Sequence, residues 1–270
     1  GKPWKQFKKT LQSTHYDLVI DAQGLIKSGL ITWLAKGKKT GLDKASLREP
    51  LARFAYHEHH RVDPTLHAIA RVRQLFASAL GYAFHDNTPE FGLDRNALMA
   101  SSTEQAKTIM LLHGTTWDTK LWPEAYWCQL TTLLKENGFK VVLPWGSSEE
   151  KARAERIATH GATVLPKQSL SDVMRAIANM RAIVAVDTGL GHVAAAFGVP
   201  MVSLYGPTDP LRTGAIGHNQ VHLSPEFACA PCLKRQCHYQ GDSEEKPACF
   251  TTLAPDLVFQ TLKTLMDKSV

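Results

Sequence analysis

The chain has 270 residues, of which 44% are hydrophobic, and it carries a formal net charge of +6 at pH 7. This length suits one large domain or two smaller ones, and the apolar content is ample for packed cores. No apolar run reaches the roughly 18 residues that a membrane span needs. The basic residues are dispersed without interleaved aromatic residues, which argues poorly for a nucleic-acid partner and weakly for acidic substrates or a membrane surface.

The first part of the chain combines strand and helix signals. Residues 16–21 indicate a strand and residues 24–35 the helix that follows it, whereas residues 47–56 and 64–80 carry apolar residues at helical spacing. Between residues 81 and 102 the pattern breaks down, as is typical of a connection between domains. The interrupting residues are Asn87, Pro89, Gly92, Ser101 and Ser102.

From residue 108 onwards, strand and helix signals alternate. Strands are expected at residues 108–113, 139–144, 163–165, 182–186 and 201–205. Helices are expected at residues 123–136, 148–159, 169–179 and 190–197, and a last one at 255–268. This order predicts a parallel sheet with helices on both faces, in which ligands bind at the carboxyl ends of the strands.

A polar loop, residues 113–124, follows the first strand of this sheet. Thr115 and Thr116 can hydrogen-bond diphosphate oxygens while Lys120 neutralises their charge. Pro123 suits the first turn of the following helix. The alternative is a surface loop with a solvated lysine.

A second turn, residues 187–192 (Asp-Thr-Gly-Leu-Gly-His), leaves a strand and opens into a helix. The first turn of a helix has N–H groups without intrahelical partners and a partial positive charge, so it can hold a phosphate. The two glycines allow close approach to the main chain, and Asp187, Thr188 and His192 supply polar atoms. The alternative is an Asp/Thr cap on an ordinary strand-to-helix turn.

Four of the five cysteines form a cluster. They are Cys229, Cys232, Cys237 and Cys249. The Cys-x2-Cys start and the four thiols fit a tetrahedral zinc site in a reducing compartment, while unlinked thiols and disulfides remain alternatives. Cys128 stands alone in a helical pattern and indicates a small buried apolar residue.

Five short motifs, in order, resemble the heptosyltransferases of the lipopolysaccharide core, an ADP-heptose group of GT-B glycosyltransferases. Residues 21–28 and 48–50 resemble acceptor-side motifs; residues 113–123, 187–192 and 205–210 resemble donor-side motifs. The match covers nearly the whole chain and is closest to type I of the family.

The resemblance implies an α/β fold of the GT-B type, with two Rossmann-like domains and parallel sheets. Residues 1–95 would form the acceptor-side domain, and residues 96–254 the donor-side domain with a cysteine-bearing insert at 226–250. Residues 255–270 would form a terminal helix that packs back on the first domain.

The family opens with a strand and a Gly-Asp turn whose aspartate is proposed as the general base. The first strand here matches a later one in the family, so the resemblance implies a truncated first domain and a base outside this chain. Asp21 ends a strand, but its motif matches a different place in the family.

The implied reaction is an inverting transfer of heptose from ADP-heptose to Kdo-lipid A, in inner-core biosynthesis. Lys120 would be catalytic, since it can stabilise the leaving diphosphate. The donor-binding set would be Thr115, Thr116, Lys120, Glu149, Asp187, Thr188, Gly189 and His192. The acceptor-binding set would be Lys27, Arg48, His67 and Arg71.

Several of these roles have plain alternatives. The acceptor-side residues could lie on ordinary solvated helix faces, Glu149 could be a solvated first-turn glutamate, and His192 could merely cap and pack. No cofactor is expected for catalysis, and structural zinc is the only metal considered. The expected location is cytoplasmic and peripheral, at the inner face of the cytoplasmic membrane.

Other functions remain open. They are a type II heptosyltransferase, a core glycosyltransferase that uses another nucleotide sugar, and an inactive nucleotide-sugar-binding fragment without the general base. A dehydrogenase is disfavoured because no Gly-x-Gly-x-x-Gly fingerprint with a following acidic residue is present.

Overall fold

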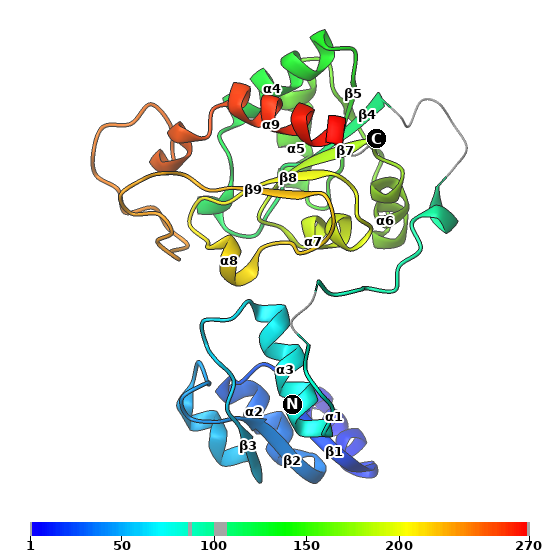
Figure 1. The fold of residues 1–270 in the computed structure, drawn as a ribbon, viewed down its shortest axis with the longest axis vertical. Coiled ribbons are helices and arrows are strands. Elements are labelled where there is room, and N and C mark those ends of the chain that lie inside the picture. The colour runs from blue at the N-terminus through cyan, green and yellow to red at the C-terminus, as the bar shows by residue number, and fades with distance from the viewer. Residues whose placement is uncertain (1, 86–87, 100–106, 269–270) are drawn as a thin grey trace. The chain divides into compact units, whose positions relative to one another are not determined.

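The computed structural model describes residues 2–85, 88–99 and 107–268. The chain divides into two compact units, Gly1–Asn87 and Thr88–Val270, each described by itself below (Figure 1). The sequence analysis placed the boundary at residue 95, which lies within the second of these units. Arg95 explains the difference, because its guanidinium donates hydrogen bonds to the carbonyl oxygens of Ala178 and Met180 at 2.8 and 2.9 Å. Of the residues that interrupt the connection, Asn87, Ser101 and Ser102 lie outside the described residues.

The first unit contains a three-stranded parallel sheet in the order β1-β2-β3. Its strands are β1 (His15–Asp21), β2 (Lys36–Leu42) and β3 (Glu58–His60). Its helices are α1 (Lys2–Ser13), α2 (Ile26–Leu34) and α3 (Ala68–Leu80), with the 3-10 helix η1 (Pro50–Ala55). The core is small: the buried cluster is Leu42, Leu47, Ala52, Tyr56, Val62 and Leu75.

The second unit contains a six-stranded sheet in the order β6-β5-β4-β7-β8-β9, and every described pair is parallel. Its strands are β4 (Thr108–Leu112), β5 (Lys140–Leu143), β6 (Thr163–Val164), β7 (Ala182–Val186), β8 (Met201–Leu204) and β9 (Gln220–Leu223). Its α-helices are α4 (Glu124–Glu136), α5 (Ser148–Ala158), α6 (Leu170–Ala178), α7 (Gly189–Ala196), α8 (Pro210–Thr213) and α9 (Pro255–Lys268). Short 3-10 helices are η2 (Asn96–Leu98), η4 (Asp118–Lys120) and η5 (Ala248–Thr252).

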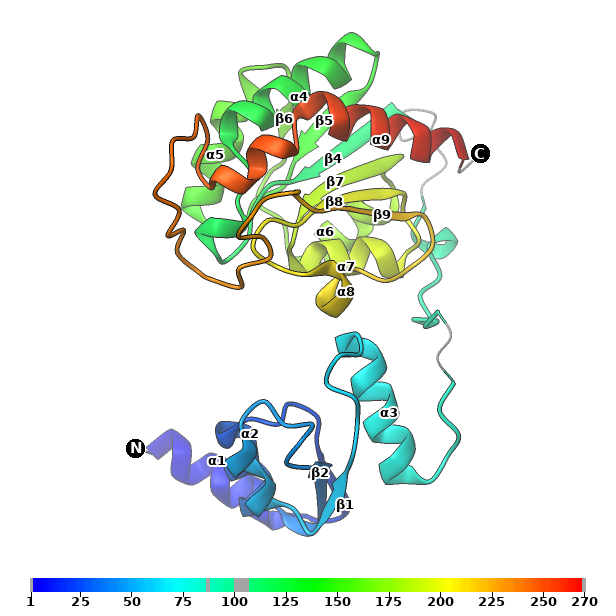
Figure 2. The same ribbon diagram turned by 60° about the vertical axis from the view of Figure 1, so that its left-hand side comes forward.

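Both faces of this sheet are covered, as the sequence predicts. In β4, Ile109 and Leu111 belong to one core cluster and Met110 and Leu112 to the other, because successive side chains of a strand point to opposite faces. Figures 1 and 2 show α4, α5 and α9 over one face and α6 and α7 over the other. A strand buried on both faces is continuously apolar, which is why β4 and β7 are readable in the sequence.

The strand order creates a crevice between β4 and β7. The chain proceeds from β4 outward through β5 to β6 and then returns to the other side of β4 with β7. The loops after β4 and β7 therefore lead away from each other, and such a switch point is where open α/β sheets bind ligands.

The terminal helix α9 packs on the sheet of the second unit. Its buried face includes Val258, Phe259 and Leu262, which belong to the same core cluster as Trp127 and Leu130 of α4. The apolar stripe of α9 is thus buried within the second unit, and its packing on the first domain stays a prediction.

Candidate functional site

The two polar turns meet at the crevice between β4 and β7. Lys120 Nζ lies 2.7 Å from Asp187 Oδ2, and both side chains are largely buried. Thr115 Oγ1 donates a hydrogen bond to the main-chain oxygen of Asp187 at 2.9 Å. These contacts join the loop after β4 to the turn after β7. The two predicted phosphate-binding turns therefore lie together, as a single ligand site requires.

Lys120 is the last residue of η4, a single 3-10 turn that brings its side chain back towards the strand ends. Its ammonium nitrogen lies 4.6 Å from the centroid of the Trp117 ring, at a distance that allows a cation–π contact. An ammonium has three N–H donors, so the ion pair with Asp187 leaves donor capacity for phosphate oxygens.

A third loop contributes Thr208, which was absent from the expected site residues. Its hydroxyl donates to Asp187 Oδ2 at 2.7 Å, and the side chain is buried. The loop follows β8, which pairs with β7. Its position after the neighbouring strand is the sequence signal that could have identified it.

The start of α7 lies at the same sheet edge. Thr188 is the N-cap residue, but its side chain makes no capping hydrogen bond. A Cβ placed on Gly189 would meet no atom within 4 Å. The alternative hypothesis, in which a side chain of this turn caps the helix, is therefore not supported. The space beside Gly189 is empty, so a ligand can approach the positive end of the helix.

A cavity of about 320 Å³ extends from this turn past the ends of β4 and β5. Its lining includes His113, Gly114, Trp145, Glu150, Thr188 and Leu190. Apolar walls with a few polar groups and a volume of some hundreds of Å³ are typical of a site for a small organic ligand.

His113 is the most perturbed titratable group of this cavity. It is buried, its Nε2 lies 3.2 Å from the carbonyl oxygen of Pro144, and its Nδ1 has no described partner. Burial, aided by the charge of Arg153, lowers the pKa of His113 to about 4. The imidazole is therefore neutral at pH 7.

Glu150, and not Glu149, lines the cavity. Glu150 forms a capping box with Ser147: its carboxylate accepts hydrogen bonds from the main-chain nitrogens of Gly146 and Ser147 at 2.7 and 3.2 Å. Glu149 is exposed and lies outside the lining, with its pKa lowered by hydrogen bonds to its own main chain and to nearby serines. The expected ribose contact of Glu149 thus stays a prediction.

The remaining donor-side residues, Thr116 and His192, are exposed, one in each turn. On the acceptor side, Lys27 and Arg48 are also exposed. Arg71 donates from Nη2 to the carbonyl oxygen of Ser46 at 2.7 Å, so it supports the fold of the first unit.

His67 caps α3, because its Nδ1 accepts a hydrogen bond from the main-chain nitrogen of Ile69. Both His67 and Arg71 are therefore partly occupied by structural contacts.

Asp21 is buried in the first unit, and its carboxylate accepts four hydrogen bonds. The donors are the main-chain nitrogens of Gln23 and Gly24 and the hydroxyls of Ser28 and Tyr56, at 2.7 to 3.0 Å. These bonds hold the turn after β1 in place, which supports a structural role for Asp21.

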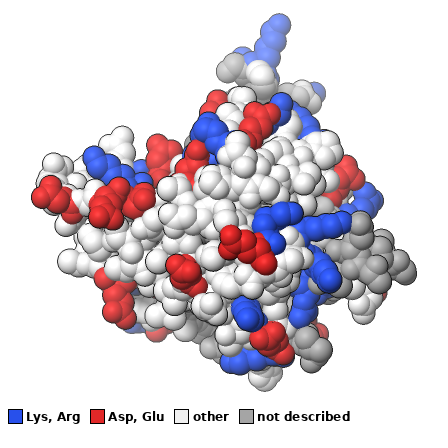
Figure 3. All heavy atoms as spheres, turned by 90° about the horizontal axis from the view of Figure 1, so that it is seen from above, with Lys and Arg blue, Asp and Glu red and all other residues white. Residues whose placement is uncertain are grey.

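The four clustered cysteines, Cys229, Cys232, Cys237 and Cys249, line one separate cavity. The isolated Cys128 lies in α4, where it packs against the core but is only partly buried, whereas the sequence analysis expected a buried residue. The face shown in Figure 3 carries both acidic and basic side chains, and several Lys and Arg side chains lie close together on the right of this view. Among the described helices, none is long and apolar enough to cross a membrane.

Comparison with known proteins connects these features to one family. Residues 4–242 match the model of glycosyltransferase family 9 (heptosyltransferase). The chain is 48% identical to lipopolysaccharide heptosyltransferase 1 of Pseudomonas aeruginosa, over 97% of this chain and 77% of that protein. It is 43% identical to the Escherichia coli K12 protein of the same name, over 80% of this chain and 69% of that protein.

Solved structures agree. E. coli heptosyltransferase WaaC with ADP matches with a TM-score of 0.81 and 35% identity, over 98% of this chain and 77% of that chain. The same enzyme with ADP-2-deoxy-2-fluoro heptose matches with a TM-score of 0.77 and 34% identity, over 100% and 77% of the two chains. E. coli heptosyltransferase II shares the fold, with a TM-score of 0.71 at 21% identity over 98% of this chain and 81% of that chain.

Proposed function

The chain belongs to glycosyltransferase family 9, the heptosyltransferases, and we propose that it transfers heptose from ADP-heptose to a Kdo-lipid A acceptor in the lipopolysaccharide inner core. The expectations of a glycosyltransferase and of an α/β fold like those of the GT-B heptosyltransferases are confirmed by these matches. The observation that carries the proposal is the ion pair between Lys120 and Asp187, which joins both predicted turns at the switch point of the sheet.

The donor would lie across the carboxyl edge of the second unit. The cavity beside His113 and Glu150 has room for a nucleoside, and the diphosphate would lie at the start of α7, near Thr115 and Lys120. The heptosyltransferase WaaC structures that resemble this chain contain ADP or an ADP-sugar analogue, which supports an ADP-sugar as the ligand.

Lys120 would act on the leaving group. As the bond from C1 to the diphosphate breaks, ADP gains negative charge, and a preset ammonium and helix N-terminus stabilise that charge more than they stabilise the ground state. Thr115 would add a hydroxyl donor once it turns from the Asp187 carbonyl, where it now donates.

Asp187 would have two tasks. Its carboxylate cannot stabilise a phosphate, but it accepts hydrogen bonds from sugar hydroxyls well. It also holds Lys120 in place at 2.7 Å, so binding of the sugar and orientation of the ammonium would depend on one side chain.

The acceptor would bind to the first unit through its basic residues. Lys27 and Arg48 are exposed there and can contact carboxylates or phosphates of the acceptor. We propose for the same reason that the protein works at an anionic membrane surface. The inverting step also needs a base for the acceptor hydroxyl, and Asp21 is not proposed for it because its oxygens are engaged by four donors.

A paired assay tests this proposal. Titration with ADP-heptose and with UDP-glucose, followed by thermal shift, should show stabilisation by ADP-heptose alone. Transfer to Kdo-lipid A should be compared with transfer to the same acceptor already carrying one heptose. Preference for the second acceptor would indicate a type II enzyme, and binding without any transfer would indicate a nucleotide-sugar-binding protein.

A further inference from the structure

The cysteine-bearing loop, residues 224–247, joins β9 to η5 and contains no helix or strand, although the structure describes all of it. Most of its side chains are exposed, so it buries little apolar surface to hold its shape. The loop is the orange segment at the edge of the second unit in Figures 1 and 2. Interactions other than apolar burial must therefore stabilise the conformation of this loop.

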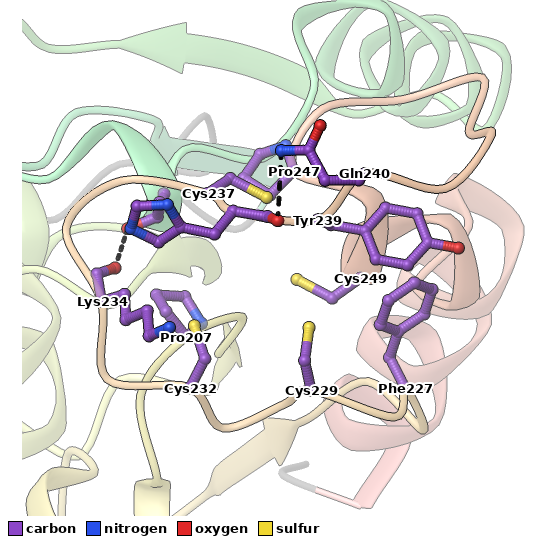
Figure 4. Close-up of a pocket in the computed structure, with 12 residues that line it drawn as sticks. Pro207, Phe227, Cys229, Cys232, Lys234, Cys237, Tyr239, Gln240, Pro247 and Cys249 are labelled. Atoms are coloured by element: carbon purple, nitrogen blue, oxygen red, sulfur yellow. Dashed lines mark hydrogen bonds between the residues drawn. The ribbon is translucent and has the colours of Figure 1, made fainter.

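Four thiols converge inside this loop. Cys229, Cys232, Cys237 and Cys249 line one cavity of about 350 Å³, and Figure 4 shows their sulfur atoms around a common space, with those of Cys229 and Cys249 facing each other. Three come from the loop, whereas Cys249 lies in η5 and is buried beside Phe250 of the core. A site here would therefore fasten the loop to the core.

The chemistry of the cavity favours a cation. Four thiolates repel one another unless a positive ion lies among them, and a metal ion deprotonates the thiols that bind it.

We propose that Cys229, Cys232, Cys237 and Cys249 form a tetrathiolate site for a transition-metal ion, zinc or iron, that orders residues 224–247. Four sulfur ligands in tetrahedral geometry select these two metals. Among the described residues, no group of three or more candidate ligands already has the spacing of a closed metal site. Binding would draw the loop cysteines towards Cys249, which is how metal binding and folding are coupled in small thiolate sites.

The site would also act on the donor pocket. Thr119 lines the thiol cavity and donates a hydrogen bond from Oγ1 to the carbonyl oxygen of Lys234 at 2.8 Å. The Arg235 guanidinium lies 5.1 Å from the ring centroid of Trp117, the ring that Lys120 also contacts. An ordered loop would thus hold the turn that carries Lys120. This consequence is additional to the proposed transfer reaction and does not depend on the donor's identity.

Metal analysis tests the site directly. The full chain is purified without chelator and its zinc and iron are measured; about one equivalent of one metal per chain is expected for a single tetrathiolate site. The reduced, metal-free protein is then titrated with Co²⁺, which should give the visible spectrum of a tetrahedral thiolate complex.

Two variants separate ligation from folding. Cys229 is exposed, so Cys229→Ser should keep the fold by circular dichroism but lose the metal and the cobalt spectrum. Cys128→Ser, outside the cluster, is the matched control and should keep both. Absence of zinc and iron together with no cobalt spectrum would overturn the proposal. Full metal content in Cys229→Ser would also overturn it. A mass of the wild-type chain that is two hydrogens lower than expected would do the same, because it would show a disulfide.

Discussion

Asp187 organises the donor site at the scale of single residues, because it follows β7 and is bound by groups from the loops after β4 and β8. Lys120 and Thr208 both contact its Oδ2, and Thr115 contacts its main-chain oxygen. A buried carboxylate is stable only with such partners. The polar residues of these turns therefore specify each other's positions before any ligand is present.

Lys120→Ala should lower kcat by about 10²–10³ and change KM much less, which is the range for removal of one preset charge-stabilising donor. The reason is that the ammonium is needed most when the diphosphate departs. Steady-state kinetics with varied ADP-heptose would measure both constants. Lys120→Arg is the matched control and should retain part of kcat. An unchanged kcat with only a raised KM would show that Lys120 does not stabilise the leaving diphosphate.

His113 gives the protein a defined pH dependence. Its folded-state pKa of about 4 lies below the ordinary value of 6.5, so between these values the unfolded chain binds a proton that the folded chain does not. The free energy of unfolding should therefore fall as the pH drops from about 6.5 to about 4, by up to about 3 kcal/mol for a shift of this size. Above pH 6.5, His113 makes no contribution to the pH dependence of the free energy of unfolding.

Urea unfolding of wild type and His113→Asn at pH 7.5 and pH 4.5 would measure this contribution. Asparagine can still donate to the carbonyl oxygen of Pro144, but it does not titrate. The variant should lose less stability on acidification than wild type does. Equal losses in the two proteins would show that His113 does not bind the proton.

At the scale of elements, sequence reasoning succeeded where strands are buried on both faces. The limits of β7 and α9 agree with their predicted ranges, since an apolar run and a helical apolar stripe mark them. It missed β2, whose sequence Lys-Gly-Lys-Lys-Thr-Gly-Leu has a single hydrophobic residue, and β3, which is only Glu58–His60. Pairing within the sheet, and not local propensity, makes these segments strands, since β2 pairs with β1 and β3 pairs with β2.

Sequence reasoning likewise found some residues of the site and missed others. Thr115, Lys120 and Asp187 could be predicted because polar residues directly after apolar strands lie at one sheet edge. Glu150 was missed although its spacing from Ser147, Ser-x-x-Glu, is the sequence signature of a capping box, and this box determines which carboxylate turns to the cavity. Arg235 reaches the site from a loop far along the chain, and no local pattern indicates that contact.

Thr119 links the cysteine-bearing loop to the turn of Lys120, so its hydroxyl should matter more than its size. Thr119→Val removes the bond to the Lys234 carbonyl oxygen and should lower the free energy of unfolding by about 1 kcal/mol. It should also lower kcat a few-fold, since the turn is held less firmly. Thr119→Ser keeps the hydroxyl and should behave like wild type in both measurements. An unaltered kcat in Thr119→Val would show that the loop does not position Lys120.

At the scale of the whole molecule, the two units differ in the size of their hydrophobic cores. The second unit holds two large clusters, one on each face of a six-stranded sheet, whereas the first has six buried residues in its cluster. Stability rises with the apolar area that a unit buries. The second unit should therefore fold without the first, and the first should not persist without the second.

A fragment of residues 88–270 should keep the donor site, because Lys120, Asp187 and the cavity beside His113 all lie in this unit. It should bind ADP within about tenfold of the full chain, a change of about 1.4 kcal/mol, and transfer no heptose, since the proposed acceptor residues are absent. Calorimetric titration with ADP and a cooperative thermal transition would test this. Lys120→Ala in the same fragment is the control and should weaken binding. A folded fragment that does not bind ADP would place part of the donor site in the first unit, contrary to the geometry of the β4–β7 crevice.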